Sequence, residues 1–352
     1  MLLNIFSDKS FLPENENHVV MLYPFWGIIP EAAGDKDAGR FDEYTRTGAN
    51  TVKLVENINE SDIVLLPFEW RSRRQWGSRS ADRVKLANDM AEMAALQDKK
   101  LLIFFNNDSR EEICVKNSLV LRTSVFRSSR GVNEYALPAW SVDFLNCYRH
   151  GALDIRNKVA VPTVGYCGYV DYLHHGLRDY SSFAKRLMQG RINFPGSRLR
   201  GKAVRALIDD PRVQVDFILR DCFNGSCEVQ MRQEYVDNMF GTDYALVVRG
   251  AGNFSYRLYE ALSCGRIPVF IDTDCLLPYS DLIDWRSLCV WVDQGDLGDI
   301  VDRILEYHNN TTDKEFIDVQ HALRMVYEQW LSPAGFFNNL WRHVIPQRNM
   351  TV

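Results

Sequence analysis

Short apolar runs alternate with stretches of helical periodicity along the chain, and this alternation is the first guide to the fold. Runs of about four to eight residues, rich in β-branched and aromatic side chains, are typical of strands buried on both faces of a sheet. A helix is predicted over 81–96, where apolar residues recur three and four positions apart. In the first half of the chain, the runs of strand length lie at 2–7, 19–23, 63–68, 101–105 and 119–126.

The same alternation begins again after about residue 157. It predicts an α/β protein with parallel sheets joined by right-handed crossovers. Two successive sets of elements favour two Rossmann-like domains that face each other across a cleft, with ligands at the carboxyl ends of the strands. The strands of the second set are predicted at 159–166, 213–219, 244–248, 267–271 and 288–292. Its helices are predicted at 172–189, 201–208, 227–240, 255–264, 297–307, 313–330 and 336–343.

Composition narrows the class of protein. A length of 352 residues suits two domains, at roughly 100–200 residues per domain. The net charge of -5 argues against a dedicated nucleic-acid binder, which would need Lys and Arg to neutralise phosphates. The N-terminus does not resemble a signal peptide, and no apolar stretch approaches the roughly 20 residues of a membrane span. Since the eight cysteines are scattered, we expect a reduced, cytoplasmic protein without structural zinc. The oligomeric state stays open.

Residues 244–292 carry the most distinctive chemistry. The strand predicted at 244–248 leads into a loop with two glycines, and a helix follows. Glycines allow close approach of the backbone to a ligand, and Asn253 or Ser255 can cap the helix. A helix that starts after a parallel strand presents free N–H groups to an anion, and Arg249 adds a charged partner. The pattern favours a phosphate site, although an ordinary tight turn would use the same residues.

Two charged residues of the predicted helix lie on one face. Arg257 and Glu260 are three positions apart, and Gly265 ends the helix. Glu260 lies far enough from the helix start for its carboxylate to reach the ribose hydroxyls of a nucleotide whose phosphates sit there. A surface ion pair between Arg257 and Glu260 is the alternative interpretation.

This segment resembles the core of the exostosin (GT47) family of glycosyltransferases. The resemblance rests on residues that occur in the family's order, namely Arg249-Gly250-Ala251-Gly252-Asn253-Phe254-Ser255-Tyr256-Arg257-Leu258, Glu260-Ala261, Gly265-Arg266-Ile267-Pro268-Val269 and Ile283-Asp284-Trp285. Val248 stands where the family usually has proline, and Arg266 stands where it usually has cysteine. Neither departure removes an expected ligand contact. Weaker similarity extends over 61–68, 104–108 and 201–205.

The resemblance implies a GT-B fold and an inverting transfer of sugar from a nucleotide-sugar, expected to be a UDP-sugar. It implies an acceptor-side domain over 1–157, a donor-binding domain over 158–325 and helices over 326–352 that return to the first domain. The nucleotide-sugar is then a co-substrate, and no cofactor or active-site metal is obligatory. The partners expected are this donor and a glycan or lipid-linked glycan. The residues that it assigns to the donor are Arg249, Gly250, Gly252, Asn253, Ser255, Arg257, Glu260 and Arg205.

The general base that such a transfer needs is expected on the first domain. Asp108 is the first choice, because it follows the strand at 101–105 and so lies at its carboxyl end. The family often has His-Asp there, whereas this chain has Asn107-Asp108. Asp8 and Glu69 follow strands of the same domain and are rivals. Capping of a turn is the structural alternative for Asp108.

The segment 69–79 is basic and aromatic and lies on the expected acceptor side. Glu69, Trp70, Arg71 and Arg74 are its candidate acceptor residues, with a Trp face for a sugar ring and Arg for charge. A solvated charged loop or contact with an anionic membrane surface are alternatives.

Two other functions remain open from the sequence. A catalytically silent relative that binds glycan or supports a partner enzyme would keep the donor segment but lack a working base. A retaining GT-B enzyme or phosphorylase would give the opposite anomeric configuration in its product.

Overall fold

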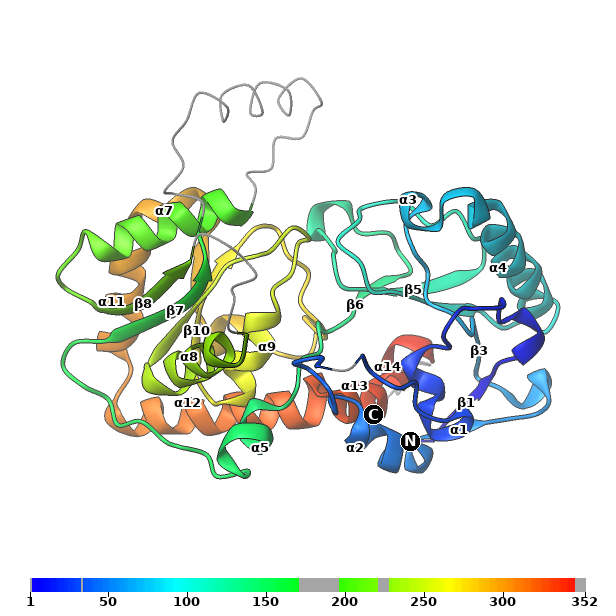
Figure 1. The fold of residues 1–352 in the computed structure, drawn as a ribbon, viewed down its shortest axis with the longest axis horizontal. Coiled ribbons are helices and arrows are strands. Elements are labelled where there is room, and N and C mark those ends of the chain that lie inside the picture. Colours follow the sequence, from blue (N-terminus) through cyan, green and yellow to red (C-terminus); the bar gives the residue numbers. More distant parts are fainter. Residues whose placement is uncertain (1, 33, 171–195, 221–227, 346–352) are drawn as a thin grey trace, which may run out of the picture.

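Two lobes, each built on a parallel sheet, make up the computed structural model, which describes residues 2–32, 34–170, 196–220 and 228–345 (Figure 1). In these residues the first sheet has six strands in the order β2-β1-β3-β4-β5-β6, and the second has five in the order β11-β10-β9-β7-β8. Every pairing between neighbouring strands of the described residues is parallel. The expected pair of Rossmann-like domains, which is the arrangement of a GT-B fold, is therefore confirmed.

The strands follow the predicted runs closely, apart from two short ones that the sequence did not indicate. The first sheet comprises β1 (Leu3–Phe6), β2 (Val52–Leu54), β3 (Ile63–Leu65), β4 (Leu101–Phe105), β5 (Ser118–Arg122) and β6 (Glu134–Ala136). The second comprises β7 (Thr163–Tyr169), β8 (Gln214–Arg220), β9 (Tyr244–Val247), β10 (Ile267–Asp272) and β11 (Val290–Asp293). The unpredicted strands are β2 and β6.

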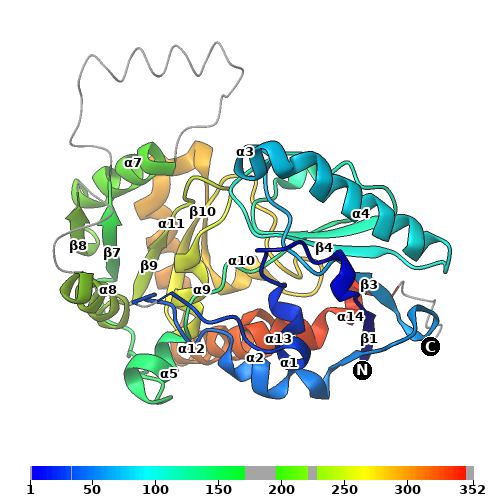
Figure 2. The ribbon, with the colours of Figure 1, turned by 45° about the vertical axis from the view of Figure 1, so that its right-hand side comes forward.

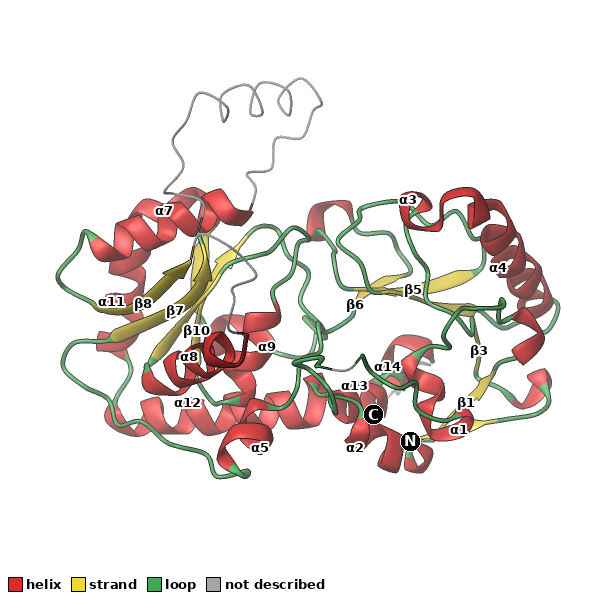
Figure 3. Cartoon of the chain, in the orientation of Figure 1, coloured by secondary structure: helices red, strands yellow, loops and turns green. Residues whose placement is uncertain are grey.

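Helices cover both faces of the sheets (Figure 3). Those of the first half are α1 (Tyr23–Trp26), α2 (Asp42–Thr47), α3 (Arg73–Trp76), α4 (Ser80–Ala95) and α5 (Phe144–Arg149). Those of the second half are α7 (Gly196–Ile208), α8 (Glu228–Gly241), α9 (Tyr256–Ser263), α10 (Trp285–Leu288), α11 (Ile300–Asn310), α12 (Asp313–Val326), α13 (Pro333–Asn339) and α14 (Trp341–Val344). The helix predicted at 172–189 lies outside the described residues. No described helix has both the length and the apolar character needed to cross a bilayer.

The 3-10 and π segments mostly begin or end these elements. They are η1 (Lys9–Phe11), η2 (Val20–Leu22), η3 (Gly48–Asn50), η4 (Ile58–Glu60), η5 (Gly77–Arg79), η6 (Arg127–Ser129), η7 (Gln294–Asp299) and the π-helix η8 (Tyr327–Leu331). The apolar run at 19–23, which was expected to be of strand type, instead forms η2 and the start of α1. Pro24 stands in the first turn of α1, where a missing N–H costs nothing.

Burial explains why β4 and α4 form as predicted. All five residues of β4 are buried, as expected for a central parallel strand. The buried residues of α4 include Ala87, Met90, Ala91 and Ala94, which lie on one face at helical spacing. This face packs on one side of the first sheet in a shared apolar cluster (Figure 2).

The chain returns to the first lobe through its last helices. The π-helix η8 continues α12, and α13 then lies against the first lobe (Figure 1). The ring of Phe337 on α13 lies 4.3 Å from that of Tyr44 and 5.5 Å from that of Trp140, measured between centroids. The Trp140 indole donates to the carbonyl of Leu331 at 3.0 Å, so the two crossings between the lobes are bonded to each other.

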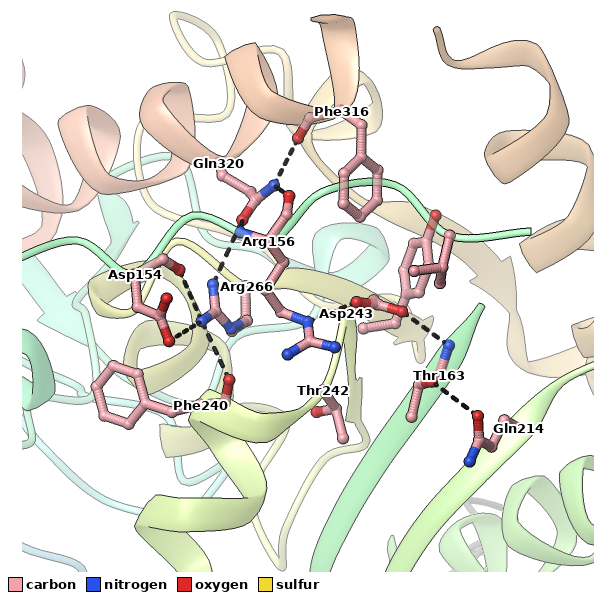
Figure 4. A network of polar contacts seen from close by, with 12 residues as sticks. Asp154, Arg156, Thr163, Gln214, Phe240, Thr242, Asp243, Arg266, Phe316 and Gln320 are labelled. Carbon is pink, nitrogen blue, oxygen red and sulfur yellow. Dashed lines mark hydrogen bonds and ion pairs between the residues drawn. The ribbon is translucent and has the colours of Figure 1, made fainter. Parts of the chain in front are cut away.

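The linker that leads from the first lobe into β7 is held by a buried polar network (Figure 4). Arg266 is fully buried, and its Nη2 donates to the carbonyls of Asp154 at 2.9 Å and Phe240 at 3.1 Å. Arg156 pairs with Asp243 at 2.6 Å, and Gln320 of α12 donates to the carbonyl of Arg156 at 2.8 Å. Arg266, one of the two departures from the family pattern, therefore ties the linker to the second lobe.

Candidate functional site

A cleft of about 750 Å³ lies between the lobes. Its second-lobe wall is formed by the carboxyl ends of β7, β8 and β9, by α8 and by the start of α9. The first lobe contributes Asp108, which follows β4, and the segment 34–37. The residues that line it are Gly34, Lys36, Asp37, Asp108, Tyr166, Cys167, Gly168, Tyr169, Arg200, Arg220, Met231, Arg232, Tyr235, Val248, Gly250, Ala251, Phe254, Ser255, Tyr256, Arg257 and Glu260. This is the edge of a parallel sheet where ligands usually bind.

The glycine-rich loop between β9 and α9 is held by the first lobe. The Gly252 amide donates to Asp108 Oδ1 at 3.0 Å, and the Asn253 amide donates to Ser124 Oγ at 2.9 Å. The Asn253 side chain is fully buried; its Nδ2 donates to the Val125 carbonyl at 3.1 Å. Both amides already have partners in the protein, so neither of these predicted donor residues offers a free backbone N–H group to a ligand.

The start of α9 keeps its capacity to bind an anion. Ser255 is the N-cap residue, yet its side chain makes no capping hydrogen bond, and it lines the cleft. The first N–H groups of a helix carry a partial positive charge directed outward. Among the residues predicted for the donor, Gly250, Ser255, Arg257 and Glu260 are those that line the cleft.

Arg257 and Glu260 meet through a tyrosine that the sequence did not indicate. The Tyr235 hydroxyl on α8 donates a short hydrogen bond to Glu260 Oε2, and Arg257 Nε donates to the Tyr235 oxygen at 3.2 Å. Burial raises the pKa of Tyr235 far above its ordinary value, so the phenol keeps its proton. Burial alone would lower the pKa of Arg257, but Tyr235, Tyr166 and Glu260 raise it overall. The cluster fixes the Glu260 carboxylate at the cleft wall.

Three further arginines make the cleft cationic. Arg200 of α7 donates to the Tyr169 carbonyl at 3.0 Å, and Arg220 at the end of β8 pairs with Glu234 at 2.9 Å. Arg232 of α8 lies 3.4 Å from Asp37 across the cleft. With Lys36 and Arg257, five cationic lining residues face three carboxylates. Of these five, only Arg257 was predicted from the sequence, because Arg220 and Arg232 reach the cleft through tertiary packing.

Two predicted donor residues besides Gly252 and Asn253 are outside this lining. Arg249 packs its guanidinium 5.7 Å from the Phe126 ring centroid, and its Nη2 donates to the Ala251 carbonyl at 3.2 Å. Burial and the neighbouring Arg110 lower its pKa. Arg205 is exposed on α7. Both are absent from the described lining of the cleft.

The three candidate base residues lie after β1, β3 and β4, as predicted. Asp8 caps η1 by accepting from the Ser10 amide at 2.8 Å. Asp108 is exposed and holds the Gly252 amide. Glu69 is partly buried, and this burial raises its pKa against the opposing effect of Arg71 and Arg40.

The candidate acceptor residues differ in their exposure. Trp70 is only 5% exposed and packs on Trp76 with ring centroids 4.8 Å apart. The expectation that it offers a ring face to a sugar is therefore corrected, because apolar neighbours cover the ring. Arg71 lies 3.5 Å from Glu16, and Arg74 is exposed on α3.

A second set of contacts joins the lobes beside the cleft. Arg127 forms a bidentate pair with Asp272 at the end of β10, with Nη2 to Oδ2 at 2.6 Å and Nη1 to Oδ1 at 3.2 Å. The Arg127 amide donates to the Asp274 carbonyl at 2.9 Å. Asp272 is thus engaged with the first lobe, and its carboxylate is buried.

Comparison with known proteins relates this chain to one family. Residues 174–308 match the family model of the exostosin GT47 domain. An exostosin-1 homolog of Caenorhabditis elegans is 30% identical over 100 residues, which is 28% of this chain and 25% of that protein. A protein of Oryza sativa subsp. japonica named "Probable glucuronosyltransferase GUT1" is 38% identical over 65 residues, which is 18% of this chain and 16% of that protein. The chain thus aligns with a quarter or less of the length of these relatives.

Among solved structures, an α1,3-fucosyltransferase aligns over 91% of this chain and 81% of that chain. Its sequence identity is 12% and its TM-score is 0.35. The fold assignment rests on the two parallel sheets, because a TM-score this low does not establish a common fold.

Proposed function

We propose that the chain is a glycosyltransferase acting on a nucleotide-sugar, with a hydroxyl group of a glycan or glycoconjugate as acceptor, because residues 174–308 match the exostosin GT47 family model. The observation that carries the proposal is the cationic cleft, whose wall includes the start of α9 and the buried Glu260 carboxylate. The family-matching segment supplies these groups, and the first lobe supplies carboxylates at the opposite edge.

The donor is proposed to bind as a UDP-sugar with its diphosphate near Ser255 and the cleft arginines. Charge that develops on a departing diphosphate is stabilised by fixed cations and helix N–H groups, which need no rearrangement during the reaction. Glu260 would then accept hydrogen bonds from the ribose hydroxyls, one turn further along α9. The nucleotide-sugar enters as a co-substrate.

The transfer is proposed to invert the anomeric configuration. The acceptor hydroxyl attacks the anomeric carbon from the face opposite the diphosphate, while a carboxylate of the first lobe takes its proton. Analysis of the product anomer separates this mechanism from the retaining alternative.

Release of UDP from a panel of UDP-sugars, including UDP-glucuronic acid, tests the proposal. The variant Glu260→Ala should raise the KM for the donor at least about tenfold, because a charge-assisted hydrogen bond contributes about 1.5–3 kcal/mol. Glu306→Ala on α11 is a matched control, since that glutamate is 61% exposed and far along the chain from the cleft. UDP binding without turnover over the whole panel would instead favour the catalytically silent alternative.

A further inference from the structure

The three carboxylates at the edge of the first sheet differ in what they already bind. Asp8 accepts from the Ser10 amide at 2.8 Å, and Asp108 accepts from the Gly252 amide at 3.0 Å. No hydrogen bond or ion pair reaches Glu69 from the residues that the structure describes. A carboxylate that no protein group engages is free to accept a hydrogen bond or a proton from a ligand. Glu69 therefore has the character of a group that serves a ligand.

Glu69 also lies at the topological switch point of its sheet. In the order β2-β1-β3-β4, the chain passes from β1 to β2 on one side of the sheet centre and then returns past β1 to β3 on the other side. The direction of strand addition therefore reverses between β1 and β3. In open parallel sheets, the crevice outside the carboxyl ends at such a point is the usual ligand site. Ser7 Oγ donates to the Leu65 carbonyl at 2.9 Å and so joins the ends of β1 and β3. Glu69 follows β3 by four residues and lies next to this crevice.

Half-buried aromatic side chains lie beside Glu69. The charge of Glu69 acts on the Tyr23 hydroxyl, and the His18 ring contacts those of Tyr23 and Trp26 edge-on, each at 5.6 Å between centroids. His18 pairs with Phe68 as an isolated bridge, which fixes this group next to the residue before Glu69. We call His18, Tyr23, Trp26 and Glu69 the acceptor crevice. Aromatic rings that keep part of their surface exposed, with polar groups at their rim, suit the mixed apolar and hydroxyl faces of a sugar.

Arg40 lies near both the acceptor crevice and the cleft. The charge of Arg40 acts on Glu69 and Tyr23 in the crevice, and also on Tyr256 in the cleft. Arg40 is held by Asp35 at 2.9 Å and lies 3.7 Å from Asp37, which lines the cleft.

We propose that a sugar of the acceptor binds in the acceptor crevice, and that Glu69 is the catalytic residue that takes the proton of its hydroxyl. This inference rests on the proposed function. The acceptor oxygen forms a bond to the anomeric carbon while the bond from that carbon to the diphosphate oxygen breaks. The diphosphate leaves with the bonding electron pair, and the hydroxyl proton moves to the Glu69 carboxylate. Asp108 is then a positioning residue that holds the donor-side loop through Gly252.

The surroundings of Glu69 suit this role. Burial raises its pKa, while Arg71 in its own segment and Arg40 ahead of α2 oppose that rise. A general base works best when its pKa lies close to the operating pH, so a raised value makes this glutamate a better base than an ordinary one. Burial also lowers the pKa of the neighbouring His18, with the Gly27 carbonyl opposing and Lys9 assisting, so the imidazole is neutral at neutral pH.

The test compares Glu69→Gln with Asp108→Asn in the UDP-release assay, using methyl β-glycosides of glucose, galactose and xylose as acceptor probes. Loss of a general base should lower kcat of Glu69→Gln by about 100- to 10,000-fold and leave the KM for the donor within about twofold. The acid limb of the kcat–pH profile should also disappear. Asp108→Asn should change kcat and the KM for the donor by less than about threefold, because its amide Oδ1 can still accept from the Gly252 amide although the carboxylate is lost. The reverse pattern, a preserved kcat in Glu69→Gln and a collapsed one in Asp108→Asn, would overturn the inference.

Two binding measurements show whether the variants are folded and whether the acceptor binds, without requiring turnover. Titration with UDP should give wild-type affinity for Glu69→Gln; loss of UDP binding would assign Glu69 to the donor site instead. Saturation-transfer NMR with the same methyl glycosides should detect binding to the wild type that falls by about 2- to 10-fold in Trp26→Ala. Absence of a wild-type signal would overturn the crevice. Absence of UDP release with every donor, together with glycoside binding, would overturn the proposed function but not the crevice.

Discussion

Replacement of Gly252 by alanine tests the contact between the glycine-rich loop and the first lobe. A Cβ atom at this position would lie 2.5 Å from Phe254 Cε1 and 2.6 Å from Asp108 Oδ1, where ordinary contacts begin at about 3.4 Å. Gly250 is the matched control, because the nearest heavy atom to a Cβ there is the Phe254 carbonyl oxygen at 3.9 Å. The two glycines belong to the same loop and differ mainly in this steric surrounding.

Overpacking of a well-packed site costs about 1–3 kcal/mol, and part of the Gly252–Asp108 hydrogen bond is lost with it. The melting temperature of Gly252→Ala should therefore fall by about 2–8 °C, whereas Gly250→Ala should change the free energy of unfolding by less than about 0.5 kcal/mol. Scanning calorimetry measures both. The double variant Gly252→Ala/Asp108→Ala should recover part of the loss, because it removes one of the two clashes. Equal melting temperatures for the two glycine variants would refute the loop geometry.

Three other changes have defined outcomes. Arg127→Ala leaves the buried Asp272 carboxylate without its bidentate partner. Because Arg127 is 40% exposed, we expect the free energy of unfolding measured in urea to fall by only about 1–2 kcal/mol. The surface variant Arg303→Ala is the control and should leave this free energy unchanged. Arg266→Met leaves buried carbonyl oxygens unpaired and should cost about 2–4 kcal/mol, and an unchanged unfolding midpoint would contradict the network of Figure 4. Tyr235→Phe should weaken UDP binding about tenfold by titration while the protein stays folded, because Glu260 loses the donor that fixes it; wild-type affinity would remove Tyr235 from the site.

Most of the fold could be predicted because several central strands are continuously apolar and the helix Ser80–Ala95 buries one face. The five residues 101–105 are all apolar, and they form β4 as expected. The strands β2 and β6 have three residues each, which is too short for a pattern to emerge. The run at 19–23 is equally apolar but forms helical turns, since burial alone does not distinguish a short strand from a short helix.

The site could be predicted only where its residues are close in sequence. Arg257 and Glu260 share a helix, so their spacing indicated a common face, and both line the cleft. Tyr235 meets them from another helix, and its position depends on how α8 packs against α9. Trp70 was placed with the acceptor from its basic neighbours, but its ring is buried against Trp76 because the tertiary fold covers it. Local patterns thus identify residue types, and tertiary packing decides which of them reach the cleft.

The bond between the Trp140 indole and the Leu331 carbonyl has a mechanical consequence. The chain crosses between the lobes twice in its described residues, once near Trp140 and once through η8, and this bond joins the two crossings at one point. The linker beyond residue 154 is fastened to the second lobe by Arg266 and Gln320, so it turns with that lobe. Any rotation of one lobe against the other must therefore have its axis close to Trp140 and Leu331. The Gly252–Asp108 and Arg127–Asp272 contacts join the lobes away from this axis and would then resist such a rotation.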